Sequence, residues 1–210
     1  MKKARLFLTL ILFSFACYCS PHYAEYKIAL KNVDCLNTPE NDQSEKKIIL
    51  FQEEGDFKSA FEDEKIKIIW TPTPSRFLFI ITNKTQDTMK ITWEQAEYID
   101  ENGTVKKVMH SAMIFSGENG SRLPTAVARD SSVSGFILPT DNVYWLSGDM
   151  AGWRKKPLFP YYNRTSADDL MVEAKEYEGK SIQVLLPVDV KNSLYNYRFT
   201  FKISDVALKE

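Results

Sequence analysis

Residues 195–204 read YNYRFTFKIS, and the alternation in this stretch decides the fold class. One face carries Tyr195, Tyr197, Phe199, Phe201 and Ile203, and the other carries Asn196, Arg198, Thr200 and Lys202. Because successive side chains of a β-strand point to opposite faces, the stretch predicts a strand with one buried and one solvent-exposed face. That pattern is typical of antiparallel sheets rather than of parallel sheets covered by helices.

Seven other stretches are rich in β-branched and aromatic residues, and turn signals such as Asn102-Gly103 separate them. They are KKIILFQ (46–52), EKIKIIW (64–70), RFLFIITN (76–83), MKITWEQAEYI (89–99), TVKKVMHSAMIF (104–115), SSVSGFIL (131–138) and KSIQVLLPV (180–188). Strands joined by short turns, with almost no helix, are typical of β-sandwiches. The sequence therefore predicts an all-β fold, an immunoglobulin-like antiparallel β-sandwich of about eight strands over residues 47–210.

One segment predicts a helix instead. SADDLMVEAKEY (166–177) begins with Ser166, which suits an N-cap, and Asp169 follows three residues later in an arrangement close to a capping box. We therefore expect one short helix in this late connection, before the last two strands.

Acidic side chains gather in ITWEQAEYIDENGTVKKVMHS (91–111), which also holds His110. The dipeptide Asn102-Gly103 is a strong hairpin signal, with Gly103 in the left-handed position. A three-residue loop 101–103 would place Ile99 opposite Val105 and Glu97 opposite Lys107, an apolar pair and an opposite-charge pair. The acidic residues are then spread along a hairpin. We expect them to fix the register of its two strands rather than to form a catalytic cluster.

The N-terminus MKKARLFLTLILFSFACYCS has the layout of a secretory signal, with three cations before an apolar core too short to span a bilayer. Its end, Ser14-Phe15-Ala16-Cys17, resembles the lipobox of bacterial lipoproteins, although that family usually has Leu where Ser14 stands and a small residue where Phe15 stands. The resemblance implies a lipoprotein-type signal peptide over 1–16 and a lipid on Cys17. The alternative is ordinary cleavage near Ser20, which would release a secreted or periplasmic protein.

Residues 17–46 predict a tether or linker, in which YKIALKN (26–32) could form a short strand. The polar run over 37–47 cannot bury apolar surface. Cys19 and Cys35 remain whether Cys17 is lipidated or removed, and in an oxidising compartment they could form a disulfide.

Charge and motifs exclude several classes of function. Without residues 1–16 the chain has 24 basic and 28 acidic side chains, so it lacks the basic surface of a nucleic-acid binder. We expect no metal and no cofactor, because no Cys/His spacing suits zinc. No nucleophile-elbow or related catalytic motif occurs, and His110 is expected to be a half-exposed strand residue. Glu94 and Asp100 would lie about 20 Å apart along a strand, too far to flank one glycosidic bond.

Aromatic and basic residues are concentrated between 144 and 162. The candidate binding surface consists of Tyr144, Trp145, Trp153, Arg154, Lys155, Phe159, Tyr161 and Tyr162. Amphipathic rings beside Arg and Lys are what a protein or glycan contact surface uses. The alternative is that these rings fold back and cover an open end of the sandwich.

The whole pattern resembles a group of uncharacterised bacterial envelope lipoproteins with one immunoglobulin-like domain. The resemblance covers residues 64–204 and rests on "TNKT" after an aromatic strand, "ITWEQAEYID-ENG", "VMHSA", "ILPTDNVYW", "GWRKKPLFP" and the final "GKSIQVLLPV…YRFTFKI". Because Tyr18 is not the Asp that retains lipoproteins at the inner membrane, the resemblance implies an outer-membrane anchor. We expect a non-catalytic binding or scaffolding module, with an envelope protein or a glycan as partner. The alternative is an exported carbohydrate-binding module or hydrolase that uses residues 144–162.

Overall fold

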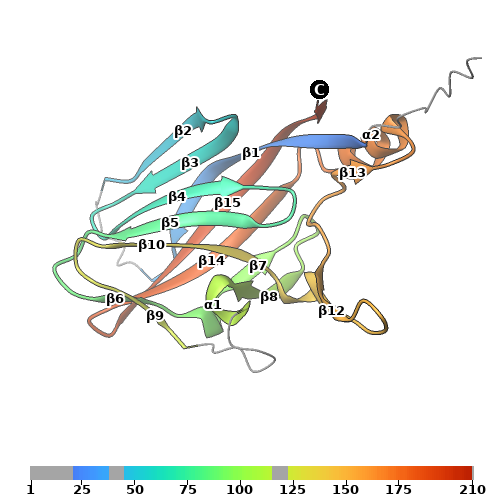
Figure 1. Cartoon of the computed structure of the whole chain (residues 1–210). Coiled ribbons are helices and arrows are strands. Elements are labelled where there is room, and N and C mark those ends of the chain that lie inside the picture. Colours follow the sequence, from blue (N-terminus) through green and yellow to red (C-terminus); the bar gives the residue numbers. More distant parts are fainter. Residues whose placement is uncertain (1–20, 38–44, 115–122, 210) are drawn as a thin grey trace, which may run out of the picture.

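The computed structural model describes residues 21–37, 45–114 and 123–209, and it contains one large curled antiparallel sheet (Figure 1). Eleven strands follow one path in the order β13-β1-β15-β14-β7-β8-β10-β5-β4-β3-β2, while β6 joins β14 and β9 joins β6. The prediction of an eight-stranded immunoglobulin-like sandwich is therefore wrong, although the all-β class is correct. The sheet has the shape of a half-barrel.

The strands of this sheet are β1 (His22–Cys35), β2 (Lys47–Glu53), β3 (Asp56–Glu62), β4 (Ile66–Pro72), β5 (Phe77–Asn83), β6 (Met89–Ile91), β7 (Glu97–Ile99), β8 (Val105–His110), β9 (Thr125–Val127), β10 (Ser132–Pro139), β13 (Tyr162–Asn163), β14 (Ser181–Val190) and β15 (Ser193–Lys209). A separate pair is formed by β11 (Val143–Leu146) and β12 (Gly152–Lys155). The short helices are η1 (Trp93–Gln95), α1 (Ser111–Ile114), η2 (Thr140–Asn142) and α2 (Ala167–Lys175).

Strand β8 explains why there is one sheet and not two. Its first three residues pair with β7, in the register of Val105 with Ile99, and its last three pair with β10, in the register of His110 with Ile137. One strand thus connects the half that contains β14 and β15 to the half that contains β4 and β5. Such a change of partner depends on residues far apart in the sequence, so the alternation within each strand does not reveal it.

Strand β1 occupies nearly half of residues 17–46, which the sequence analysis assigned to a tether with a possible short strand. It is 14 residues long and pairs with β15 from Tyr23 to Cys35. The register shifts between Lys27 and Ile28 and again between Leu30 and Asn32. Both shifts fall within residues 26–32. Buried side chains alternate through Ala24, Tyr26, Ile28 and Leu30 and resume at Val33, so the strand extends beyond the predicted stretch at both ends. The predicted signal peptide over 1–16, Cys17 and Cys19 lie outside the described residues.

The core lies inside the curl, where the inner face of β4 and β5 packs against β14 and β15. The ring of Trp70 lies 5.2 Å from that of Phe199, and the ring of Phe77 lies 4.9 Å from that of Phe201, both measured between centroids. All four rings are fully or almost fully buried. The curled sheet therefore packs on itself, as the two layers of a sandwich would.

Helix α2 covers one end of this core. The Ser166 side chain accepts a hydrogen bond from the backbone N–H of Asp169 at 3.0 Å, so the predicted helix and its N-cap are confirmed. Leu170 and Ala174 of the helix are buried. Tyr177, just after the helix, packs its ring against the rings of Phe159 and Tyr26.

The β7–β8 hairpin has the predicted register. Glu97 lies opposite Lys107, with 3.9 Å between their charged atoms, and Gly103 has a left-handed φ of 81°. Burial alone would raise the pKa of Asp100, but hydrogen bonds from Lys106 and from the backbone of Thr104 and Asn102 outweigh it and lower the pKa. The hydrogen bonds hold the Asp100 carboxylate inside the turn, so its role is structural.

Candidate functional site

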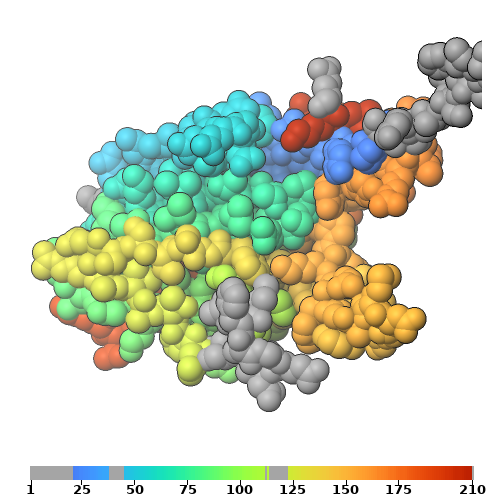
Figure 2. Space-filling model, viewed as in Figure 1, coloured from blue at the N-terminus to red at the C-terminus, as the bar shows by residue number. Residues whose placement is uncertain are grey.

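Strands β11 and β12 form a hairpin that projects from the body of the molecule (Figures 1 and 2). We call residues 143–155 the aromatic hairpin. Within it Trp145 lies opposite Trp153, and Tyr144 lies opposite Arg154. Neither strand pairs with the large sheet in the part of the chain that the structure describes. A two-stranded hairpin is weakly stable by itself, so the base of this one needs to be fixed to the body.

The base of the aromatic hairpin is held by polar contacts. The side-chain amide of Asn142 donates to the carbonyl oxygens of Lys156 at 3.2 Å and Pro157 at 3.0 Å, and the N–H of Lys156 donates to the carbonyl of Asn142 at 2.7 Å. Two residues later, the N–H of Leu158 donates to the carbonyl of Pro74 at 2.7 Å. The Asn142 bonds close the base of the hairpin, and the Leu158 bond ties the chain after it to the loop between β4 and β5.

Large apolar side chains on the hairpin remain in contact with water. Trp145 is 53% exposed, Trp153 51% and Tyr144 40%. The two indole rings meet edge to face, with centroids 5.5 Å apart and planes inclined at 77°. The tip adds Leu146 and the strongly exposed Met150. An exposed apolar group of this kind is typical of an interaction site.

Cations border these rings on the side nearer the sheet. Lys155 shares a face of the hairpin with the two tryptophans, and its ammonium lies over the ring of Phe136 at 5.1 Å. The Arg76 guanidinium lies over the same ring at 5.2 Å. Burial, and then the nearby Arg76, lower the pKa of Lys155. The tryptophan face therefore continues onto β10 as a surface of aromatic rings and positive charge.

The structure divides the predicted binding surface into three places. Tyr144, Trp145, Trp153, Arg154 and Lys155 all lie on the aromatic hairpin. Phe159 belongs to the core, since it is 1% exposed and packs against Tyr26, so its inclusion in a contact surface was wrong. Tyr161 is half-buried, and the exposed Tyr162 packs against Tyr23 on β1, at the end of the sheet where α2 lies.

Sequence reasoning missed four members of this surface. Leu146 and Met150 were not singled out, although LSGDMAG (146–152) has the composition of a turn between two strands. Arg76 and Phe136 are far from the hairpin in sequence, and only the fold brings them close to Lys155. No local signal could have found that pair.

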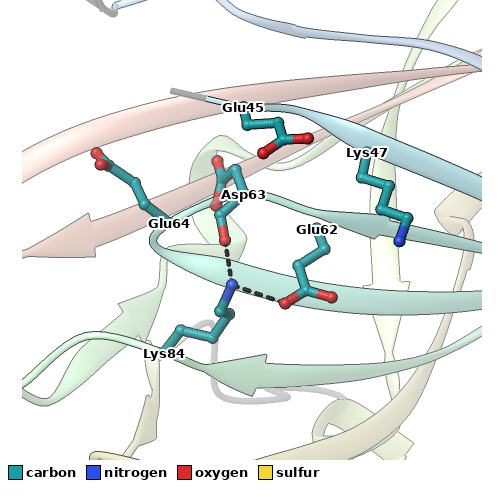
Figure 3. Close-up of a pocket in the computed structure, with 6 residues that line it drawn as sticks. All are labelled: Glu45, Lys47, Glu62, Asp63, Glu64 and Lys84. Atoms are coloured by element: carbon teal, nitrogen blue, oxygen red, sulfur yellow. Dashed lines mark hydrogen bonds and ion pairs between the residues drawn. The ribbon is translucent and has the colours of Figure 1, made fainter. Parts of the chain in front are cut away.

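A polar hollow of about 410 Å³ lies at the end of β3 (Figure 3). The ammonium of Lys84 donates to the backbone carbonyl of Asp63 at 2.5 Å and pairs with the carboxylate of Glu62 at 2.7 Å. The Asp63 side chain accepts hydrogen bonds from the Ile66 N–H and the Tyr197 hydroxyl, each at 2.8 Å. Burial, and then Asp63, raise the pKa of Tyr197. Lys84, Glu62 and Asp63, which face the hollow, therefore already have structural partners.

His110 is buried rather than half-exposed, which corrects the sequence-based expectation. Its ring stacks on that of Trp93 at 4.2 Å, with an angle of 10° between the planes. Burial lowers the pKa of His110 to about 4, so the imidazole is neutral near pH 7. Its Nε2 has no hydrogen-bond partner among the described residues. The packing is that of a core histidine.

The structure describes residues 21–37, 45–114 and 123–209. No group of three or more His, Cys, Asp or Glu side chains there could hold a metal ion. No helix in those ranges is long and apolar enough to cross a membrane. Cys35, the described half of the predicted Cys19–Cys35 bridge, ends β1 and is half-buried.

Comparison of the chain with protein-family models, with curated proteins and with solved structures finds no match.

Proposed function

We propose that the protein is a non-catalytic binding protein of the cell envelope and that the aromatic hairpin is its contact element. The observation that carries this proposal is the exposure of Trp145, Trp153 and Tyr144 on an element outside the sheet. Tryptophan, tyrosine and arginine dominate the binding energy of protein interfaces. The hairpin supplies all three residue types within thirteen residues of chain.

A protein surface suits this element better than a polysaccharide does. Sugar rings stack on the faces of aromatic rings, so a flat polysaccharide needs rings that lie in one plane. The planes of Trp145 and Trp153 are inclined at 77° and form no flat platform. An edge-to-face pair instead presents a ridge that can fill a pocket in a partner protein.

The location forms part of the same proposal and is supported by the N-terminal sequence. Cys17 follows an apolar core and a small residue, so a lipid on this cysteine would hold the domain at the outer membrane. Mass spectrometry of the mature N-terminus tests this step. We expect a diacylglycerol on Cys17, and an unmodified chain that begins at Ser20 or later would contradict the anchor.

Site-specific photocrosslinking in intact cells tests the contact element. A photoreactive amino acid replaces Trp145 in one variant and Val105 in another, because Val105 is 55% exposed and lies on the sheet rather than on the hairpin. We expect a discrete protein adduct at Trp145 and none at Val105. Equal adducts at both positions, or none at either, would contradict the proposal.

A further inference from the structure

Strand β2 is an edge strand that is apolar on both faces. Among the described residues it pairs with β3 alone, and it ends the path of the sheet (Figure 1). Ile48 and Leu50 point to one face, Ile49 and Phe51 point to the other, and the first three of these are exposed. Native edge strands are normally protected by charges, prolines or bulges. Five uncharged residues, 48–52, separate the only charged ones in this strand.

Side chains that lie opposite each other on adjacent strands form rows across the sheet. The exposed side chains of Ile48 and Leu50 belong to rows whose members on β3 are buried. Across β3 the row of Ile48 continues to Phe61, which is fully buried, and the row of Leu50 continues to Ser59, which is 1% exposed. At β2 the same rows become 37% exposed at Ile48 and 53% at Leu50. The edge therefore has the composition of an interior strand, although among the described residues it has a hydrogen-bonded strand on one side only.

The hairpin loop determines which backbone groups of β2 point outward. Glu53 pairs with Asp56 across a loop of two residues, Glu54 and Gly55, and both loop residues have positive φ, as a type I′ turn requires. The flanking pair of such a loop exchanges its backbone hydrogen bonds within the hairpin, and the pattern alternates along the strand. The N–H and C=O groups of Ile48, Leu50 and Gln52 consequently point away from β3.

The sequence of β2, KIILFQE, complements itself when two copies run antiparallel. A two-fold axis through Leu50 places Lys47 opposite Glu53 of the second copy, and it places Ile49 opposite Phe51. Ile48 then lies opposite Gln52, and Leu50 lies opposite its own equivalent. Opposite charges and apolar residues that face each other are the pairs that stabilise antiparallel sheets.

We propose that β2 pairs antiparallel with β2 of a second copy of this chain, about a two-fold axis at Leu50. Such an interface is isologous, because the same patch serves both copies. The outward backbone groups of Ile48, Leu50 and Gln52 then all find partners. Glu53 already accepts from Lys58 at 2.7 Å through one oxygen, so its other oxygen can receive Lys47 of the second copy. This interface is separate from the aromatic hairpin, so its test is independent of the test of the proposed function.

Cysteine crosslinking of the full chain in cells tests both the contact and its register. Directly opposite residues in an antiparallel pair have Cα atoms about 4.5 to 5.5 Å apart, within the range that a disulfide can bridge. Mild oxidation is expected to convert Leu50→Cys to a covalent dimer. Ile48→Cys and Gln52→Cys should each form little dimer alone but should crosslink when two differently tagged copies are expressed together.

The matched control is Ile80→Cys, a similarly exposed apolar residue on the central strand β5, and the unsubstituted chain reports any background from the native cysteines. Dimer formation by Leu50→Cys at the level of Ile80→Cys would overturn the proposal. An adduct with a different protein and none with a second copy would also overturn it.

Charge reversal gives a second test that leaves the apolar residues intact. In the Leu50→Cys background, Lys47→Glu or Glu53→Lys places like charges at both ends of the pair. Dimer formation should fall about tenfold, because the two surface pairs together change by about 1.4 kcal/mol, or about 0.7 kcal/mol each. Together, the two single variants carry opposite charges and should form mixed dimers at the original level. Absence of that rescue would contradict the two-fold register.

Discussion

The tryptophans of this chain serve different purposes in two regions of the molecule. Trp70 is completely buried, and its ring contacts Phe79, Phe199 and others inside the curl of the sheet. Trp145 and Trp153 are half exposed on a hairpin that projects from the sheet. Burial of a large aromatic ring stabilises a fold, whereas a group of exposed rings does so weakly and exposes apolar surface to water. The difference in exposure separates residues that stabilise the fold from residues that are free to contact a partner.

The largest effect is expected in the core. Trp70→Ala removes a ring packed on all sides and leaves a cavity, so the free energy of unfolding should fall by about 3–5 kcal/mol. Urea denaturation followed by circular dichroism measures this loss. The matched variant Trp153→Ala should change the free energy of unfolding by about 0.5 kcal/mol or less, as is usual at exposed positions. Equal losses for the two variants would remove the distinction between the regions.

A second prediction concerns pH and the buried face of β8. The folded-state pKa of His110, about 4, lies below the value of about 6.5 expected in the unfolded chain, so the unfolded state takes up a proton first as the pH falls. The stability linked to neutral His110 is therefore complete above about pH 6.5 and decreases as the pH falls toward 4. Between pH 7 and pH 5 the loss should be about 2 kcal/mol.

His110→Phe keeps a ring against Trp93 and has no group that titrates in this range, so it is the control for that prediction. Urea denaturation at pH 7 and at pH 5 should show a smaller loss of stability for His110→Phe than for the parent chain. The same loss in both proteins would show that His110 is not the responsible group.

A third and smaller effect is expected where α2 covers the end of the core. Ser166→Ala removes the side-chain acceptor of the Asp169 N–H and should cost about 1 kcal/mol. Ser166→Asp retains an acceptor at the N-cap and should restore most of that stability. Thermal unfolding of the two variants checks the prediction, which an equal loss for both would contradict.

Local patterns predicted much of the fold, because they depend on residues close in sequence. The alternation around Phe199 and Phe201, the Ser166 cap and the register of Glu97 with Lys107 were all readable in this way. The number of layers was not readable, because β8 changes partner between its two halves. The full length of β1 was not readable either, because β1 pairs with β15, which is far away in the sequence. Both features depend on long-range pairing.

The candidate site was predictable in composition but not in arrangement. The sequence analysis identified the aromatic and basic residues of 144–162 as one surface, whereas the structure separates Phe159 and Tyr162 from Trp145. Side-chain chemistry alone could not distinguish a core ring from an exposed one. Phe159 is buried because Tyr26 and Tyr177 come from distant parts of the chain to cover it.

The central claim is that the aromatic hairpin contributes to binding and not to the fold. The most direct test uses the double variant Trp145→Ser/Trp153→Ser, with the photoreactive amino acid placed at Tyr144, and measures both stability and adduct yield. The free energy of unfolding should stay within about 1 kcal/mol of the parent, while the yield of the protein adduct should fall about tenfold or more. A loss of several kcal/mol in stability, or an unchanged adduct yield, would contradict the account.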